Sequence, residues 1–195
     1  MRTTPKDGAT PLDPDESEGL IPTHVTTREE LNRLEQENIV AAMQWLETAR
    51  PKDILSEAFL RKLHQRMFGR VWEWAGQFRT SDKNIGVPRE RIGIELRNLC
   101  EDTKAQIEHA SYPADEIACR FHHRLVWIHP FPNGNGRHAR LITDLLLEKI
   151  LQQQPFTWGG MSGIPEGDIR AAYLDALRAA DRGDFSRLAE FVRRQ

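Results

Sequence analysis

The sequence predicts an all-α fold, because apolar residues recur at helical spacing in segment after segment and only one short segment suggests strands. Hydrophobic residues make up 39% and charged residues 29% of the 195 positions, a balance typical of globular proteins. The length allows one domain with a buried core. We therefore expect a single helical domain over residues 25–195, preceded by an extended, proline-rich arm over residues 1–24.

The first two helices carry recognisable start and stop signals. Thr27 followed three residues later by Glu30 is a capping box, and it predicts a helix that Pro51 ends. Ser56 is a suitable N-cap for a second helix, which Gly69 would end. The later helices follow from apolar periodicity, at residues 92–107, 113–128, 136–150, 166–182 and 185–194.

The one segment that suggests strands is TSDKNIGVP, residues 80–88. Its turn formers gather around Asn84, Ile85 and Gly86, so a short β-hairpin or a loop is expected there.

Composition also narrows the class of function. The formal net charge of −2 argues against nucleic-acid binding, and no apolar run is long enough to span a membrane. No signal-peptide pattern opens the sequence. Cys100 and Cys119 have neither metal-ligand spacing nor a CxxC arrangement, which suits a reducing compartment. We expect a cytoplasmic protein; the sequence does not indicate an oligomeric state.

A polar, glycine-rich loop, HPFPNGNGRHAR at residues 129–140, separates the two most apolar helices. Gly134 and Gly136 let the backbone turn its N–H groups toward one place, where the next helix adds the partial positive charge of its N-terminus. Arg137 and Arg140 are three residues apart and can share one face. These groups together suit a di- or triphosphate. For the two arginines alone, pairing with nearby carboxylates beside a plain connector is the alternative.

The same loop resembles the Fic motif, HxFx(D/E)GNGRxxR. The matching positions are His129, Phe131, Gly134, Asn135, Gly136, Arg137 and Arg140. WEWAGQFR and AAYLDALRAADRGDFSRLAEF are also similar to Fic segments, so the resemblance covers about residues 28–192. It implies a Fic-type helical bundle with a short β-hairpin flap. The form HPFPNGNGRHAR is further similar to a small bacterial subgroup labelled mobile mystery protein B.

The resemblance implies a protein AMP transferase, which moves AMP from ATP to a Ser, Thr or Tyr hydroxyl of a target protein. His129 would be the general base, a role that suits the ordinary pKa of histidine. The nucleotide phosphates would be held by Asn133, Gly134, Asn135, Gly136, Arg137 and Arg140. Phe131 would anchor the loop in the core, whereas His122 and His123 match no motif position and are expected to be packing residues.

Asn133 is the one departure from the motif, since the family usually has Asp or Glu there to bind Mg²⁺ across the phosphates. An amide oxygen can ligate but brings no charge, so weak Mg²⁺ affinity is expected.

Two further roles follow from the resemblance. The flap, with Asn84, Ile85, Gly86 and Val87, would pair with the extended backbone of the target; an ordinary surface hairpin explains its composition equally well. Glu37, on the first helix, is a candidate autoinhibitory acid that would pair with Arg140. Because Arg33 stands where Ser or Thr is usual, an exposed Arg33–Glu37 pair is the equal alternative.

Two other functions remain open. Asn133 allows transfer of a different phosphate-linked group or removal of AMP. The second of these functions is that of a nucleotide-binding interaction module whose catalysis has lapsed.

Overall fold

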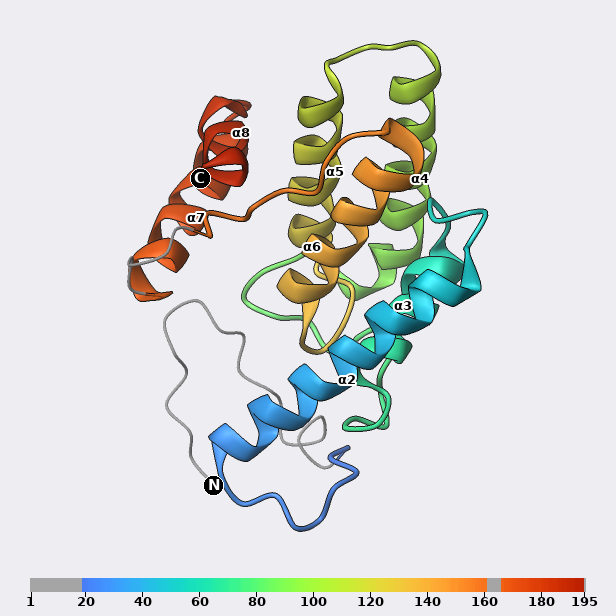
Figure 1. The fold of residues 1–195 in the computed structure, drawn as a ribbon, viewed down its shortest axis with the longest axis vertical. Coiled ribbons are helices and arrows are strands. Elements are labelled where there is room, and N and C mark those ends of the chain that lie inside the picture. Colours follow the sequence, from blue (N-terminus) through green and yellow to red (C-terminus); the bar gives the residue numbers. More distant parts are fainter. Residues whose placement is uncertain (1–18, 161–165, 195) are drawn as a thin grey trace.

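The computed structural model describes residues 19–160 and 166–194, and within them the protein is helical, which confirms the all-α expectation. Figure 1 shows the helices in order. They are α2 (Arg28–Ala49), α3 (Glu57–Phe68), α4 (Ile92–Glu108), α5 (Ala114–Ile128), α6 (Asn135–Leu146), α7 (Glu166–Ala180) and α8 (Ser186–Arg193). A 3₁₀ turn, η1 (Arg89–Arg91), precedes α4, and a π-helical turn, η2 (Leu147–Leu151), continues α6.

The two predicted helix starts are present. The Thr27 hydroxyl accepts the N–H of Glu30 at 3.2 Å, and the Glu30 carboxylate accepts the N–H of Thr27 at 3.1 Å. The Ser56 hydroxyl accepts the N–H of Phe59 at 3.2 Å, and α3 ends at Gly69 as expected. These caps satisfy backbone groups that would otherwise lack partners at helix ends.

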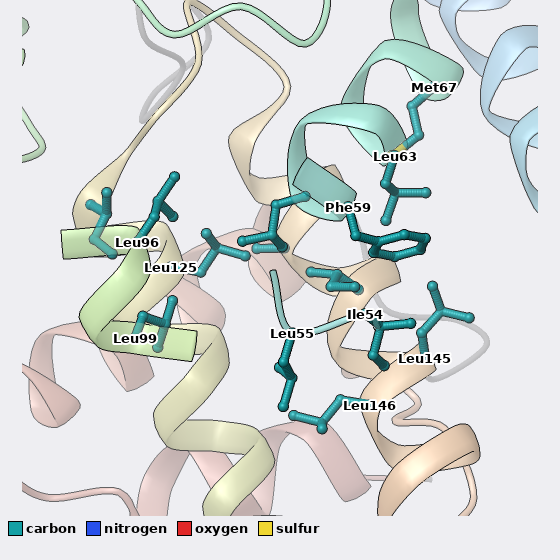
Figure 2. Packing of buried hydrophobic residues seen from close by; sticks show 14 of the residues in the cluster. Ile54, Leu55, Phe59, Leu63, Met67, Leu96, Leu99, Leu125, Leu145 and Leu146 are labelled. Atoms are coloured by element: carbon teal, nitrogen blue, oxygen red, sulfur yellow. The ribbon is translucent and has the colours of Figure 1, made fainter. Parts of the chain in front are cut away.

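The main core lies between α2, α3, α4, α5 and α6, with the segment before α3 packed into it. Figure 2 shows aliphatic side chains of α3, α4, α5 and α6 packed together, among them Leu63, Leu96, Leu125 and Leu146. A second, smaller cluster joins α7 and α8 to α5 and η2. The helix pairs α4–α5 and α5–α6 are in contact, so the loop between α5 and α6 is held on both sides by packed helices.

The predicted β-hairpin is wrong, because residues 80–88 contain no strand in the structure. We still call residues 80–88 the flap. The backbone at its two ends bonds to the last residue of α5 and to the loop that follows α5. The N–H of Arg79 donates to the Pro130 carbonyl at 2.9 Å, and the N–H of Val87 donates to the Ile128 carbonyl at 3.3 Å. Two backbone N–H groups that a hairpin ladder could use, those of Arg79 and Val87, are therefore already bonded elsewhere.

Most of the predicted arm, residues 1–18, lies outside the described part of the chain. Its last residues bond to the segment after α3: Leu20 forms an antiparallel bridge with Trp72, and the Glu73 N–H donates to the Gly19 carbonyl at 2.9 Å. The boundary between arm and domain stays a prediction.

Cys100 and Cys119 are buried and unbridged, and burial raises the pKa of their thiols to about 11 and about 12. Among the described helices, none has the length and apolar character required to cross a membrane.

Candidate functional site

The site begins at the end of α5, where His129 caps the helix in a left-handed conformation with φ of 53°. Its side chain is buried. Burial lowers the pKa of the ring to about 4, and the positive charges of Arg79 and Lys83 act in the same direction, against a hydrogen bond with the Val126 carbonyl. The imidazole is therefore neutral at pH 7, the form in which a ring nitrogen can accept a proton.

Arg79 ties the flap to His129, and the sequence reasoning did not single it out. The side chain of Arg79 is buried. Its Nε donates to the His129 carbonyl at 2.7 Å, and its terminal nitrogens donate to the carbonyls of Ser81, at 2.9 Å, and Val87. One guanidinium thus holds both ends of the flap against the helix terminus that carries His129.

The flap reaches His129 through Gly86. A Cβ added at Gly86 would lie 2.8 Å from the Cβ of His129 and 3.1 Å from the Ile128 carbonyl oxygen, and the φ of Gly86 is +94°. Only glycine fits such a close approach and such a backbone. Of the remaining predicted flap residues, Asn84 and Ile85 are exposed and Val87 is buried.

Phe131 anchors the loop as expected, since its ring is fully buried. Asn135 closes the loop around it: the Asn135 amide nitrogen donates to the Phe131 carbonyl at 2.7 Å, and the Asn135 amide oxygen accepts the Phe131 N–H at 2.9 Å. Both polar groups of the Asn135 side chain are therefore occupied. Its predicted contact with a phosphate stays a prediction and would fall to its backbone N–H.

His64 on α3 is a second residue that the sequence reasoning missed. Its Nδ1 accepts the Gly76 N–H at 3.0 Å, so the proton lies on Nε2, which donates to the Asn133 carbonyl at 3.0 Å. Burial first, then the charges of His138 and Arg137, lowers the pKa of His64 well below its usual range. His64 lies four residues after Leu60 on the buried stripe of α3, so helical periodicity could have identified it.

The start of α6 has the features of an anion site. Gly134, its N-cap, has a φ of 76° and makes no side-chain capping bond. A Cβ at Gly134 would lie 2.6 Å from the Phe68 ring, whereas a Cβ at Gly136 would meet nothing within 4 Å. Of these two glycines, only the one at position 134 is required by the packing of the protein. An uncapped helix N-terminus with an open approach at Gly136 favours an anionic ligand.

The loop does not fit a magnesium ion held by protein carboxylates. The Asn133 amide oxygen accepts the N–H of Gly134 at 2.5 Å and carries no charge. Among residues 19–160 and 166–194, no three His, Cys, Asp or Glu side chains gather to form a metal site. A divalent ion here would depend on the phosphates of a bound nucleotide.

The two motif arginines contact different groups of side chains. Arg137 pairs with Glu35 at 2.7 Å and lies 4.9 Å over the Phe68 ring. Arg140 lies 4.8 Å over Tyr173, and its buried Nε has no hydrogen-bond partner among the described residues. Both guanidiniums project from the first turns of α6, where cations oppose the helix dipole unless an anion is bound.

Glu35, not Glu37, is the acid of α2 that reaches the motif. Its carboxylate is buried, accepts the indole N–H of Trp72 at 2.7 Å and pairs with Arg137. Glu37 is exposed. A buried carboxylate needs partners, and Glu35 falls on the buried stripe with Asn38, so its importance could have been read from the sequence.

The two other histidines of α5 pack as expected. His122 is buried with its Nε2 2.8 Å from the Tyr173 hydroxyl, and the Nε2 of His123 lies 2.8 Å from the Asp181 carboxylate.

Comparison with known proteins identifies similar sequences and folds. A sequence model described as the Fic/DOC family matches residues 54–147. The protein adenylyltransferase Fic of Drosophila melanogaster is 30% identical over 146 residues, which cover 72% of this chain and 27% of that protein. The chain spans about a quarter of the length of another curated relative, the protein adenylyltransferase fic-1 of Caenorhabditis briggsae, at 28% identity.

Solved structures share the fold. Fic-1 (residues 134–508) of Caenorhabditis elegans superposes with a TM-score of 0.67 at 25% identity, over 90% of this chain and 51% of that one. BepC of Bartonella tribocorum, solved with bound AMPPNP, gives a TM-score of 0.63 at 19% identity, over 91% and 95%. The resemblance to the subgroup labelled mobile mystery protein B stays a prediction. The matched segment contains the loop at residues 129–140 with its seven motif positions, and the chain belongs to the Fic/DOC family.

Proposed function

We propose that this chain is a protein adenylyltransferase that moves AMP from ATP to a Ser, Thr or Tyr hydroxyl of a target protein, with His129 as the general base. The observation that carries the proposal is a buried, neutral imidazole in the same loop as an uncapped helix start and two arginines. Curated relatives carry the name protein adenylyltransferase, and BepC binds AMPPNP, an ATP analogue.

The proposed reaction uses each part of the site. The target hydroxyl attacks the α-phosphorus of ATP, and its proton passes to the neutral ring of His129. The bond from the α-phosphorus to the α–β bridging oxygen breaks, and pyrophosphate leaves. Backbone N–H groups at the start of α6 stabilise charge on the phosphate oxygens, while Arg137 and Arg140 hold the leaving pyrophosphate. The exposed part of the flap, residues 84–86, aligns the target backbone.

Label transfer from α-³²P-ATP tests this function directly. The wild-type chain should label one or more proteins of a cell lysate, whereas His129→Ala should label none and still bind ATP in calorimetry, because its ring moves a proton and holds no phosphate. Since the pKa of His129 is about 4, transfer by the wild type should not lose its base until the pH approaches that value. Equal labelling by His129→Ala would remove His129 from the mechanism.

Asn133 favours one alternative, a nucleotide-binding module with lapsed catalysis, because its neutral amide is already bonded to Gly134. Asn133→Asp in the same assay separates the two functions. If the enzyme is competent, the aspartate should speed transfer at limiting Mg²⁺, and the difference should fade at saturating Mg²⁺. If neither form labels a protein at high Mg²⁺ while both bind ATP, the binding module is the better assignment.

A further inference from the structure

Trp127 is a large aromatic side chain left on the surface beside the proposed site. It lies on the last turn of α5, two residues before His129, and 43% of it is exposed. Tryptophan is highly buried on average, and it is enriched among the residues that carry most of the binding energy at protein interfaces.

The indole of Trp127 is held as part of a built arrangement. The guanidinium of Arg124 stacks over it at 4.1 Å. Arg124 in turn donates to the carboxylate of Glu95 at 2.5 Å, and the same carboxylate accepts from Arg91 at 2.7 Å. Glu95 is buried on α4 and fixes the position of Arg124, which in turn holds Trp127. A partner that binds this surface therefore does not have to order these two side chains at a cost in conformational entropy.

This surface is continuous with the flap. The Val87 N–H bonds to the carbonyl of Ile128, the neighbour of Trp127, so the end of the flap lies against the last turn of α5. Ile94, next to Glu95 at the start of α4, is 55% exposed, and Ile85 on the flap is 46% exposed. Figure 1 shows α4 and α5 side by side along this edge. Three exposed apolar side chains therefore lie on the elements that meet here: Ile85 on the flap, Ile94 at the start of α4 and Trp127 on the last turn of α5.

The charge around this surface differs in sign from that of the whole chain. Residues 80–97, from the flap to the second turn of α4, contain four basic and three acidic side chains, whereas the chain as a whole has a net charge of −2. Glu95, one of those three acids, is already paired with two arginines. A partner segment with acidic residues is complementary to this local excess of positive charge.

We propose that Trp127, with Ile94 and Ile85, binds an apolar side chain of the target segment that lies on the flap, and that acidic residues flank this side chain in the target. The inference rests on the proposed function, since it names the class of target that the same site accepts. Trp127 would add a contact outside the motif and the flap. The interface would have an apolar side chain at its centre and charged residues around it.

A binding assay tests the surface independently of catalysis. The probes are fluorescein-labelled peptides that contain one threonine and either leucine or alanine near it, each with aspartate or lysine flanks. Wild-type protein should bind the leucine–aspartate peptide best, by anisotropy. Trp127→Ala should weaken that binding about tenfold, the loss expected when an interface anchor is truncated. ATP affinity should stay unchanged.

Tyr112→Ala is the matched control. Tyr112 is also an exposed aromatic, at 37%, with an arginine, Arg120, 4.0 Å over its ring, but it lies just before α5, far along that helix from His129. This variant should bind the peptides as the wild type does. In label transfer to the same peptide, Trp127→Ala should raise KM and leave kcat unchanged, whereas a general loss of folding would lower the apparent kcat and leave KM unchanged.

The outcomes separate the two proposals. Peptide binding that depends on Trp127 without any label transfer would support this surface and contradict the proposed reaction. Label transfer that is insensitive to Trp127→Ala and to the peptide charge would overturn the inference and leave the reaction standing. If Trp127→Ala instead breaks up a dimer in sedimentation, without changing peptide binding, the surface belongs to a second copy of the chain and the inference is wrong.

Discussion

Glu35 and Glu37 are two positions apart on α2, yet they have opposite surroundings. Successive residues of an α-helix turn by about 100°, so two positions separate side chains by about 200° around the axis. Glu35 therefore enters the buried stripe and meets Arg137, whereas Glu37 faces solvent. The carboxylate of Glu35 pairs with the guanidinium of Arg137, which the proposed function assigns to the phosphates of ATP.

Glu35→Gln should raise the affinity for ATP severalfold. The glutamine oxygen can still accept the Trp72 indole N–H, but it no longer competes as a charge for Arg137 or repels the phosphates. Calorimetry with ATP measures the change, and Glu37→Gln is the control that removes the same charge from the exposed face without effect. A lower affinity in Glu35→Gln would mean that the carboxylate positions Arg137 for the nucleotide.

The sequence predicted the residues of the loop but not the partners of their side chains. The spacing from His129 to Arg140 lies within one segment and is visible in one dimension. The Glu35–Arg137 pair joins residues 102 positions apart, and the bond from His64 to Asn133 joins residues 69 apart. Such pairs depend on how the helices are placed in space, which neither periodicity nor capping specifies.

At the scale of elements, helices were predicted well because their signals are local. Thr27, Ser56 and Gly69 act on backbone groups within one turn, and the structure places each at a helix end. The flap was mispredicted because its turn-forming composition is equally consistent with a loop whose backbone bonds elsewhere. The guanidinium of Arg79, which shapes this loop, bonds to carbonyls at both of its ends, a long-range role that composition cannot show.

Gly86→Ala should abolish label transfer while ATP binding persists. The added methyl group would require φ of +94° from an L-residue and would approach His129 to 2.8 Å, so the flap and the base must separate. Gly93→Ala, on α4, is the control: its Cβ would meet only the Glu57 carboxylate at 4.0 Å, and alanine favours a helix. Normal transfer by Gly86→Ala, measured with α-labelled ATP, would show that the close approach is dispensable.

At the scale of the whole molecule, the fold contains four buried histidines whose pKa values are lowered, all by burial in the first place. The pKa falls to about 3 for His122 and to about 4 for His129 and His138, and it lies well below the usual range for His64. In the unfolded chain each ring titrates near 6.5. At pH values between the folded and the unfolded pKa, these rings therefore bind fewer protons in the folded protein than in the unfolded chain.

The free energy of unfolding should accordingly be highest above about pH 6.5 and fall as the pH drops toward 4. Each ring contributes a slope of about 1.4 kcal/mol per pH unit in that range. Asp144 opposes the trend below pH 6, because burial raises its pKa to about 6 and the fold then takes up its proton. Urea unfolding at pH 7 and pH 5 measures how the free energy of unfolding depends on pH. His122→Phe should reduce this slope by about 1.4 kcal/mol per pH unit, the contribution of one proton. A flat profile would contradict the neutral assignment of these rings.

The two apolar clusters have a consequence for motion. Tyr173, over which Arg140 lies, belongs to the smaller cluster formed by α7, α8, α5 and η2, whereas Arg137 packs on Phe68 in the larger one. Separate clusters can open as separate cooperative units, so backbone amides of α7 and α8 should exchange with deuterium sooner than those of α3 and α5. Each opening would separate Tyr173 from Arg140 and leave Arg137 on Phe68. A nucleotide that holds Arg140 in place should therefore slow the exchange of α7 and α8.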